Sequence, residues 1–242
     1  ATVWMIWTTT ALTKTNAALI TAAGSSQRFG EKKEYLAFGD NHSATVLSEC
    51  LYTFISTGMF GQYIITVPHG DVEKAKASLF TDERLKTLAG SLENAVHLVE
   101  GGTSRQESVY RGLLQLPADS VSAVAVHDGA RPWVSKELIA AVLTATETYG
   151  AAVPTIPVTD TQKEIDDTGK IIRHLVRDRI VAVQTPQGFR FDELLYAHRC
   201  AEHDGRCYTD DSEIYAAYCG PVYICAGSRE NKKITYREDL MI

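Results

Sequence analysis

The chain has 242 residues, 45% of them hydrophobic and 22% charged, and its formal net charge at pH 7 is −6. This composition is typical of a soluble globular protein, and the acidic balance argues against nucleic acid or an anionic membrane as a partner. No stretch of the sequence approaches the roughly 18 consecutive apolar residues that a membrane-spanning helix needs.

The cysteines and the first residues give information about the cellular compartment of the protein. Five cysteines are widely spaced and form no C-x-x-C motif. This pattern is typical of reduced thiols in a cytoplasmic protein, and not of a disulfide framework or a zinc site. Residues 1–16 lack the basic start and the continuous apolar core of a signal peptide. We interpret residues 1–16 as an N-terminal tail and residues 17–242 as a single domain.

Apolar runs and helical patterns alternate from residue 17 onward. Strands are predicted at 17–21, 63–67, 96–99, 121–126 and 151–157, and helices at 45–57, 72–86, 104–115 and 135–149. Continuous apolar strands that alternate with helices indicate a parallel sheet that is buried on both faces. We therefore expect an α/β fold with a Rossmann-like, mostly parallel sheet covered by helices on both faces.

The region 159–179 has a different pattern. Two short strand patterns, 161–165 and 170–175, flank the turn sequence Asp-Asp-Thr-Gly, which predicts a β-hairpin. An isolated hairpin is only marginally stable, so we expect this protruding arm to pack on another subunit or back on its own domain. Beyond the arm we predict strands at 182–184 and 222–225, helices at 191–204 and 210–218, and a last helix opened by a capping box at Thr235 and Glu238.

The stretch from Ala22 to Lys33 follows the first predicted strand and is rich in small and basic residues. Ala22, Ala23 and Gly24 allow backbone N–H groups to approach a polyphosphate closely. Arg28 and Lys33 place two cations where the oxygens of a transferring phosphate gather negative charge. The stretch matches neither the dinucleotide fingerprint nor a Walker loop. An ordinary turn with a solvated basic flank is the alternative.

A second small-residue turn, at 101–108, also follows a predicted strand. Gly102 and Thr103 supply a closely approachable backbone, and Ser108 lies one turn into the following helix. Such a helix N-terminus suits an anion or the carbonyl of a base, although an ordinary turn would have the same sequence. Parallel strands bring their carboxyl ends to one edge of a sheet, so we expect this turn, the first one and the turn at 127–131 to border one ligand site.

A third turn, His127–Arg131, carries a carboxylate and a cation. Asp128 can hold Mg²⁺, which prefers oxygen ligands, or it can cap a turn. Arg131 can contact phosphate or pair with Asp128. Thr161 and Arg177 on the arm can receive a second phosphate or stay solvated. The same two possibilities hold for Lys233, which precedes the last predicted helix.

The motifs occur in an order that resembles a known family. They are Ala22-Ala23-Gly24, Arg28, Lys33, Gly102, Arg105, Ser108-Val109, Val126 to Pro132, Pro157 to Thr161, Thr185-Pro186-Gln187 and Asn231 to Thr235. From about residue 17 to residue 240 the set resembles the 2-C-methyl-D-erythritol 4-phosphate cytidylyltransferases of the non-mevalonate isoprenoid pathway, which belong to the polyol-phosphate cytidylyltransferases. Ribitol 5-phosphate cytidylyltransferases share the pattern in the nucleotide half, and Lys163 favours methylerythritol phosphate. A non-catalytic nucleotide-binding regulator would have lost the Arg28 and Lys33 pair.

The resemblance implies a Mg²⁺-dependent enzyme that converts CTP and methylerythritol phosphate into CDP-methylerythritol and pyrophosphate. It also implies a homodimer joined through the arm. By match to the family, the catalytic residues are Arg28, Lys33 and Lys233. The nucleotide-binding residues are Ala22, Ala23, Gly24, Gly102, Thr103, Ser108, Asp128 and Gly129, with Asp128 also on the metal. The residues for the polyol phosphate are Arg131, Thr161, Arg177, Thr185 and Thr209.

Three positions depart from the family pattern. Ser26 stands where a second glycine is common, Glu34 replaces a common glutamine, and Glu230 stands where an acidic residue is often aspartate. The first makes the phosphate loop less permissive, and the second places a negative charge beside Lys33. The third leaves the number of metal ions open.

Overall fold

A mixed sheet forms the centre of the molecule in the computed structural model, which describes residues 14–24, 26, 29–39 and 43–240. The sheet order is β10-β5-β9-β4-β1-β2-β3, and β8 pairs with β5. The strands are β1 (Thr15–Thr21), β2 (Phe60–Val67), β3 (Val96–Glu100), β4 (Val121–Asp128), β5 (Ala151–Pro157), β8 (Val181–Val183), β9 (Gln187–Arg190) and β10 (Tyr223–Ala226). The pairs β1–β2, β1–β4, β2–β3 and β5–β10 are parallel, so the sheet is mostly parallel as predicted.

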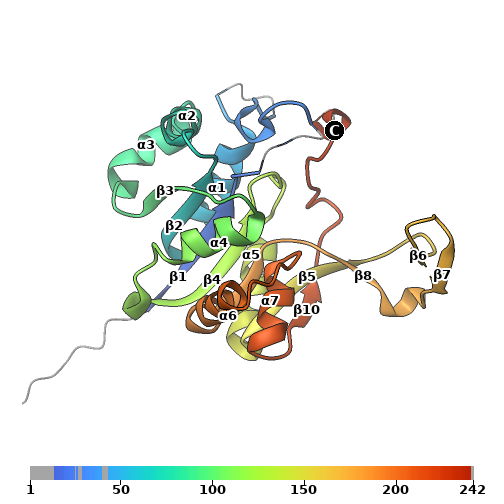
Figure 1. Cartoon of the computed structure of the whole chain (residues 1–242). Coiled ribbons are helices and arrows are strands. Elements are labelled where there is room, and N and C mark those ends of the chain that lie inside the picture. The colour runs from blue at the N-terminus through green and yellow to red at the C-terminus, as the bar shows by residue number, and fades with distance from the viewer. Residues whose placement is uncertain (1–13, 25, 27–28, 40–42, 241–242) are drawn as a thin grey trace, which may run out of the picture.

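Helices cover both faces of this sheet (Figure 1). One face carries α1 (Val46–Ser56), α2 (Val72–Leu79), α3 (Glu83–Leu92) and α5 (Lys136–Tyr149), and the other carries α4 (Arg105–Leu113), α6 (Phe191–His203) and α7 (Asp211–Tyr218). Strand β1 shows why both layers form. Its residues Ala18 and Ile20 join the first core, whereas Ala17 and Leu19 join the second. Alternate side chains of a strand point to opposite faces, so an all-apolar strand requires cover on both sides.

The helix predicted at 72–86 is wrong: two helices, α2 and α3, occupy the region. Asp82 separates them. Its carboxylate is fully buried, accepts from the backbone N–H of Arg84 and pairs with the Arg84 guanidinium at 2.7 Å. A side chain that accepts backbone N–H bonds begins a new helix, and this capping role overrides the continuous amphipathic pattern.

Strand β9 was not predicted, because Gln187–Arg190 is short and neither continuously apolar nor alternating. It runs antiparallel between β4 and β5 and is buried by that pairing. The last helix is also wrong in detail. The carboxylate of Asp239, and not a box with Glu238, accepts from the N–H groups of Thr235 and Tyr236, and only the short 3₁₀ turn η4 (Arg237–Leu240) follows.

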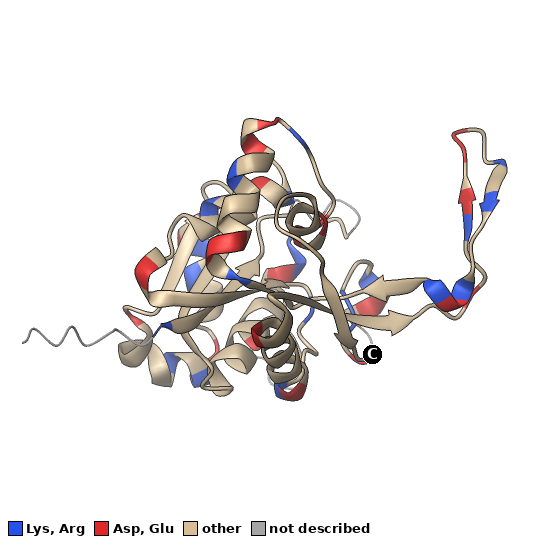
Figure 2. Cartoon of the chain, turned by 90° about the horizontal axis from the view of Figure 1, so that it is seen from below, with Lys and Arg blue, Asp and Glu red and all other residues tan. Residues whose placement is uncertain are grey.

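The predicted arm is present and extends from the body (Figures 1 and 2). Strands β6 (Lys163–Ile165) and β7 (Ile171–His174) form a two-stranded antiparallel sheet of their own, and the 3₁₀ turn η3 (Arg177–Arg179) follows. The Asp166 carboxylate closes the turn by accepting from the N–H groups of Thr168 and Lys170. Four apolar side chains of this segment are exposed: Ile165, Ile171, Ile172 and Val176.

Two other elements complete the described chain, the 3₁₀ turns η1 (Lys33–Tyr35) and η2 (Ala118–Ser120). The N-terminal tail predicted at residues 1–16 lies outside the described residues up to residue 13, and β1 already begins at Thr15. Across the described parts of the chain, every helix is too short or too polar to pass through a bilayer.

Candidate active site

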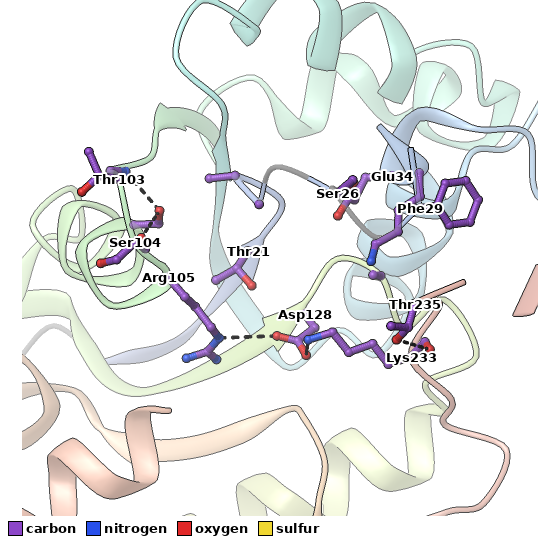
Figure 3. A pocket seen from close by; sticks show the side chains of 16 residues that line it. Thr21, Ser26, Phe29, Glu34, Thr103, Ser104, Arg105, Asp128, Lys233 and Thr235 are labelled. Carbon is purple, nitrogen blue, oxygen red and sulfur yellow. Dashed lines mark hydrogen bonds and ion pairs between the residues drawn. The ribbon is translucent and has the colours of Figure 1, made fainter. Parts of the chain in front are cut away.

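A pocket of about 710 Å³ opens at the carboxyl ends of β1, β3 and β4. The three turns that were expected to border one site do meet there. The pocket is lined by Thr21, Ala23, Gly24, Ser26, Phe29, Lys33, Glu34, Gly102, Thr103, Ser104, Arg105, Ser108, Asp128, Ala130, Lys233 and Thr235. Figure 3 shows cationic side chains from separate segments converging on one carboxylate.

That carboxylate is Asp128, the last residue of β4 (Figure 3). Its Oδ2 accepts from the Lys233 ammonium at 2.8 Å and lies 3.5 Å from Nε of Arg131, and its Oδ1 lies 3.6 Å from Nε of Arg105. Burial alone would raise the pKa of Asp128, but these three cations hold it well below its ordinary value. Asp128 is therefore a fixed negative charge at neutral pH.

A chain of hydrogen bonds supports Asp128 from beneath the pocket. The Asp128 N–H donates to the Thr185 hydroxyl at 3.0 Å, and that hydroxyl lies 3.1 Å from Nδ1 of His127. Nε2 of His127 lies 3.2 Å from the carbonyl oxygen of Arg131. Burial lowers the pKa of His127 to about 4, so the ring is neutral, and both of its nitrogens are occupied. His127 is therefore a buried packing residue near the end of β4.

The turn between β3 and α4 is held from the helix side. Ser104 caps α4 by accepting from the Glu107 N–H. The Glu107 carboxylate does not complete a capping box with Ser104, and accepts instead from the N–H and the hydroxyl of Thr103. The Ser108 hydroxyl accepts from the Gly102 N–H at 3.0 Å. These bonds fix Gly102, Thr103 and Ser108 along one wall of the pocket.

Another part of the pocket wall comes from the stretch after β1. Ala23 and Gly24 line the pocket, while Ala22 is buried and its N–H donates to the Thr66 carbonyl oxygen. Lys33 lines the pocket and is 9% exposed. Arg28, predicted to be catalytic, lies outside the described residues.

Sequence reasoning missed the place of Arg105 in the site, although its motif was recognised. Its Nη1 donates to the buried carboxylate of Asp211 at 2.7 Å, and that carboxylate also contacts Nε2 of His198 at 3.1 Å. Asp211 is 106 positions away from Arg105, so no local pattern could have paired them. Their contact joins α7 to the start of α4 and holds the Arg105 guanidinium beside Asp128.

The residues expected for the polyol phosphate are not gathered in one place. Arg131 and Thr185 lie beneath the pocket on Asp128, and Arg131 Nη1 also donates to the Asn231 carbonyl oxygen. Thr209 precedes α7, where its N–H and hydroxyl donate to Glu213. Thr161 and Arg177 are on the exposed arm, away from the pocket of their own chain.

One predicted nucleotide-binding residue, Gly129, also lies beneath the pocket surface. Its N–H donates to the Thr21 carbonyl oxygen at 2.9 Å. A Cβ at this position would lie 3.1 Å from that same oxygen. The close approach of the chain after β4 to the end of β1 therefore depends on a residue without a side chain.

Comparisons with known proteins identify the family and agree with this fold. The model of the IspD family, 2-C-methyl-D-erythritol 4-phosphate cytidylyltransferase, matches residues 16–242. A protein of that name from Pelotomaculum thermopropionicum is 37% identical over 228 residues, covering 93% of this chain and 91% of its own length. Another, from Carboxydothermus hydrogenoformans, is 37% identical over 224 residues, covering 92% of this chain and 91% of the relative.

Solved structures show the same similarity. The crystal structure of 4-diphosphocytidyl-2C-methyl-D-erythritol synthase from Anaerococcus prevotii superposes with a TM-score of 0.77 and 27% identity, and covers 94% of this chain and 95% of that one. The crystal structure of 2-C-methyl-D-erythritol 4-phosphate cytidylyltransferase from Thermus thermophilus gives a TM-score of 0.70 and 31% identity, with coverage of 92% and 94%. The likeness therefore extends over the whole fold.

Proposed function

Because the chain belongs to the 2-C-methyl-D-erythritol 4-phosphate cytidylyltransferase family, we propose that it transfers CMP from CTP to 2-C-methyl-D-erythritol 4-phosphate and releases pyrophosphate. The observation that carries this proposal is the convergence of Lys233 and Arg105 on the buried Asp128, between two small-residue turns. Such a pocket suits a ligand with a polyanionic end and a neutral base.

The reaction needs positioning and charge neutralisation more than acid–base chemistry. The attacking group is the phosphate of the polyol, which is already ionised near pH 7, so no protein base has to remove a proton. The ring of His127, which precedes Asp128 in β4, is buried and neutral with both nitrogens occupied, and it does not act as a base. Held reactants and fixed cations account for catalysis.

We propose the following roles for these residues, as the family resemblance implies. Lys33 and Lys233, with Arg28, neutralise the charge that grows on the α-phosphate during attack. The backbone N–H groups near Ala23 and Gly24 bind the triphosphate. Ala22 holds this stretch against the sheet through its hydrogen bond to Thr66. Gly102, Thr103 and Ser108 hold the cytosine from the other wall. Gly129 keeps Asp128 close to the ribose side.

A divalent cation fits the donor set. Mg²⁺ is usually held by one or two carboxylates together with substrate phosphates. In the part of the chain that the structure describes, no three His, Cys, Asp or Glu side chains gather as a complete metal site. Asp128 and Glu34 are the carboxylates among the residues that line the pocket, and Glu34 is paired with Lys32. Asp128 would hold Mg²⁺ with the phosphates of CTP, and the ion would supply further neutralisation of their charge.

We also infer a homodimer in which the arm reaches the partner's pocket. Thr161 and Arg177 would bind the polyol phosphate there, while Arg131, Thr185 and Thr209 serve it from the pocket's own chain. The exposed isoleucines of the arm support this arrangement, because contiguous exposed apolar side chains mark protein contacts. The body would be one nucleotidyltransferase domain, and the free thiols among the described residues are consistent with a cytoplasmic enzyme.

Pyrophosphate release from CTP and Mg²⁺, measured separately with methylerythritol phosphate and with ribitol 5-phosphate, tests the proposal. We expect faster turnover with methylerythritol phosphate. Faster turnover of ribitol 5-phosphate would indicate that the protein is a ribitol 5-phosphate cytidylyltransferase instead. CTP binding without pyrophosphate release from either polyol phosphate would indicate a nucleotide-binding regulator.

A further inference from the structure

Lys32, which lies next to the predicted catalytic lysine, has an unusual place. Its ammonium group does not enter the pocket but lies against the backbone of the stretch after β1. It donates to the carbonyl oxygen of Ala22 and, at 2.7 Å, to that of Gly24. The side chain is only 13% exposed. A cation in this position holds two carbonyl groups of the same short turn.

These contacts decide which way the neighbouring amide groups face. The carbonyl of Ala22 and the N–H of Ala23 belong to one planar trans peptide group, so they point in opposite directions. The Ala22 N–H is already bound to Thr66 in the sheet. With the Ala22 carbonyl fixed on Lys32, the Ala23 N–H is directed away from Lys32. Because Ala23 and Gly24 line the pocket, this orientation favours an anion there.

Glu34 completes the arrangement. Its Oε2 lies 3.4 Å from the Lys32 ammonium and accepts from the Ser26 hydroxyl at 3.1 Å. Ser26 has a φ of +50°, which a residue with a side chain rarely adopts. Glu34 lines the pocket and is only 5% exposed. Removal of Lys32 would take away a cation that offsets the charge of Glu34 beside the place proposed for the triphosphate.

We propose that Lys32 and Glu34 are a pair of positioning residues for the triphosphate of CTP. Lys32 fixes the carbonyls of the loop and neutralises Glu34, and Glu34 holds Ser26 in its left-handed conformation. Ser26 and Glu34 both depart from the family pattern, and the hydrogen bond between them joins the two departures in one set of contacts. Neither Lys32 nor Glu34 touches the reacting atoms. This inference rests on the proposed function.

The experiment compares Lys32→Met, Glu34→Gln and the double variant with the unaltered enzyme, in full steady-state kinetics for both substrates. Lys32→Met should raise the KM for CTP about tenfold, the scale of losing a hydrogen bond to a charged group, with little change in the KM for methylerythritol phosphate. Glu34→Gln keeps a partner for Ser26 and should change the KM for CTP less. The double variant should recover part of the loss, because removing one member of a buried pair is worse than removing both.

Lys14→Met is the matched control, because Lys14 forms a partly exposed ion pair with Asp192 outside the pocket. It should leave both KM values unchanged. Thermal unfolding of each variant separates positioning from folding. A lowered melting temperature with unchanged KM for CTP, or equal rises in both KM values, would overturn the inference. If Lys32→Met does not fold, the Glu34→Gln and Ser26→Ala variants decide: an unchanged KM for CTP in both would overturn it.

The activity of the unaltered enzyme distinguishes a failure of this inference from a failure of the proposed function. If it fails to release pyrophosphate from CTP, the proposed function is wrong. If it does so and the variants show no selective change in the KM for CTP, only the inference about Lys32 and Glu34 is wrong.

Discussion

At the scale of single residues, the site is organised around one carboxylate and the cations that hold it. Asp128 is paired on both oxygens, and its pKa lies below the ordinary value despite burial. Acidification through the range in which carboxylates usually titrate therefore leaves its charge in place. Any loss of activity in mild acid must come from another group.

Replacing Lys33 by alanine separates binding from turnover. The remaining walls still contact CTP, so its dissociation constant should change by less than about tenfold. Turnover should fall about 100-fold or more, as when one donor to the transition state is lost. Isothermal titration with CTP and pyrophosphate release measure the two effects. Lys86→Ala, at an exposed position on α3, is the control, and an unchanged turnover for Lys33→Ala would remove Lys33 from catalysis.

The buried His127 makes stability depend on pH. Its folded pKa of about 4 lies below that of an unfolded histidine, about 6.5. The unfolded state therefore binds more protons between these values, and stability falls as the pH falls. Relative to His127→Gln, the free energy of unfolding of the unaltered protein should decrease by about 2 kcal/mol between pH 7.5 and pH 5. Urea unfolding at both pH values measures this difference, and a pH-independent difference would show that His127 does not titrate as inferred.

At the scale of elements, the amino end of α4 builds the base-binding wall. The Thr103 N–H is held by Glu107 one turn into the helix, and Gly102 lies against the same carboxylate. A Cβ on Gly102 would lie 2.1 Å from Cδ of Glu107. The turn therefore contacts the Glu107 side chain of α4 directly, and a side chain added at Gly102 would displace it.

Gly102→Ala should displace Glu107 and release Thr103. We expect the KM for CTP to rise about tenfold, the scale of overpacking a well-packed site, with a smaller change in the KM for the polyol phosphate. Gly90→Ala, where nothing lies within 4 Å of an added Cβ, is the matched control. Equal effects of the two substitutions on the KM for CTP would contradict a special role of the turn.

The elements also show what a sequence can and cannot predict. The parallel strands were recognisable because each is a continuous apolar run, and the three turns could be grouped because they follow such runs. Strand β9 escaped because long-range pairing, and not its own pattern, buries it. The break at Asp82 depends on its bond to Arg84, and the position of Arg105 depends on Asp211, far along the chain. The sequence pattern singled out Arg28 and Lys33, and it could not predict that Lys32 donates to the carbonyl groups of Ala22 and Gly24.

At the scale of the whole molecule, contacts within one chain do not account for the composition and position of the arm. It carries exposed apolar residues and two residues expected at the polyol phosphate, yet it extends from the body (Figure 1). In an assembly with a second copy, the exposed apolar side chains would pack against that copy. The two residues expected at the polyol phosphate would reach its pocket.

Replacing Ile172 and Val176 by aspartate should weaken the dimer without unfolding the body, because both side chains are exposed in the single chain. Sedimentation should show a shift from dimer toward monomer at assay concentration. Turnover should fall in parallel. Tyr196→Asp on α6, which is also exposed, is the control, and a doubly substituted protein that stays dimeric would contradict arm-mediated dimerisation.

The outward reach of the arm has a genetic consequence. If each active centre takes its walls from one subunit and its arm from the other, two separately inactive variants can complement one another in trans. Subunits with Lys33→Ala keep a working arm, and subunits with Arg177→Ala keep a working pocket. Mixed dimers would then contain one intact centre, and activity should reappear when the two inactive proteins are unfolded and refolded together. An arm that folds back on its own chain would leave every centre with a defect, and the mixture would stay inactive.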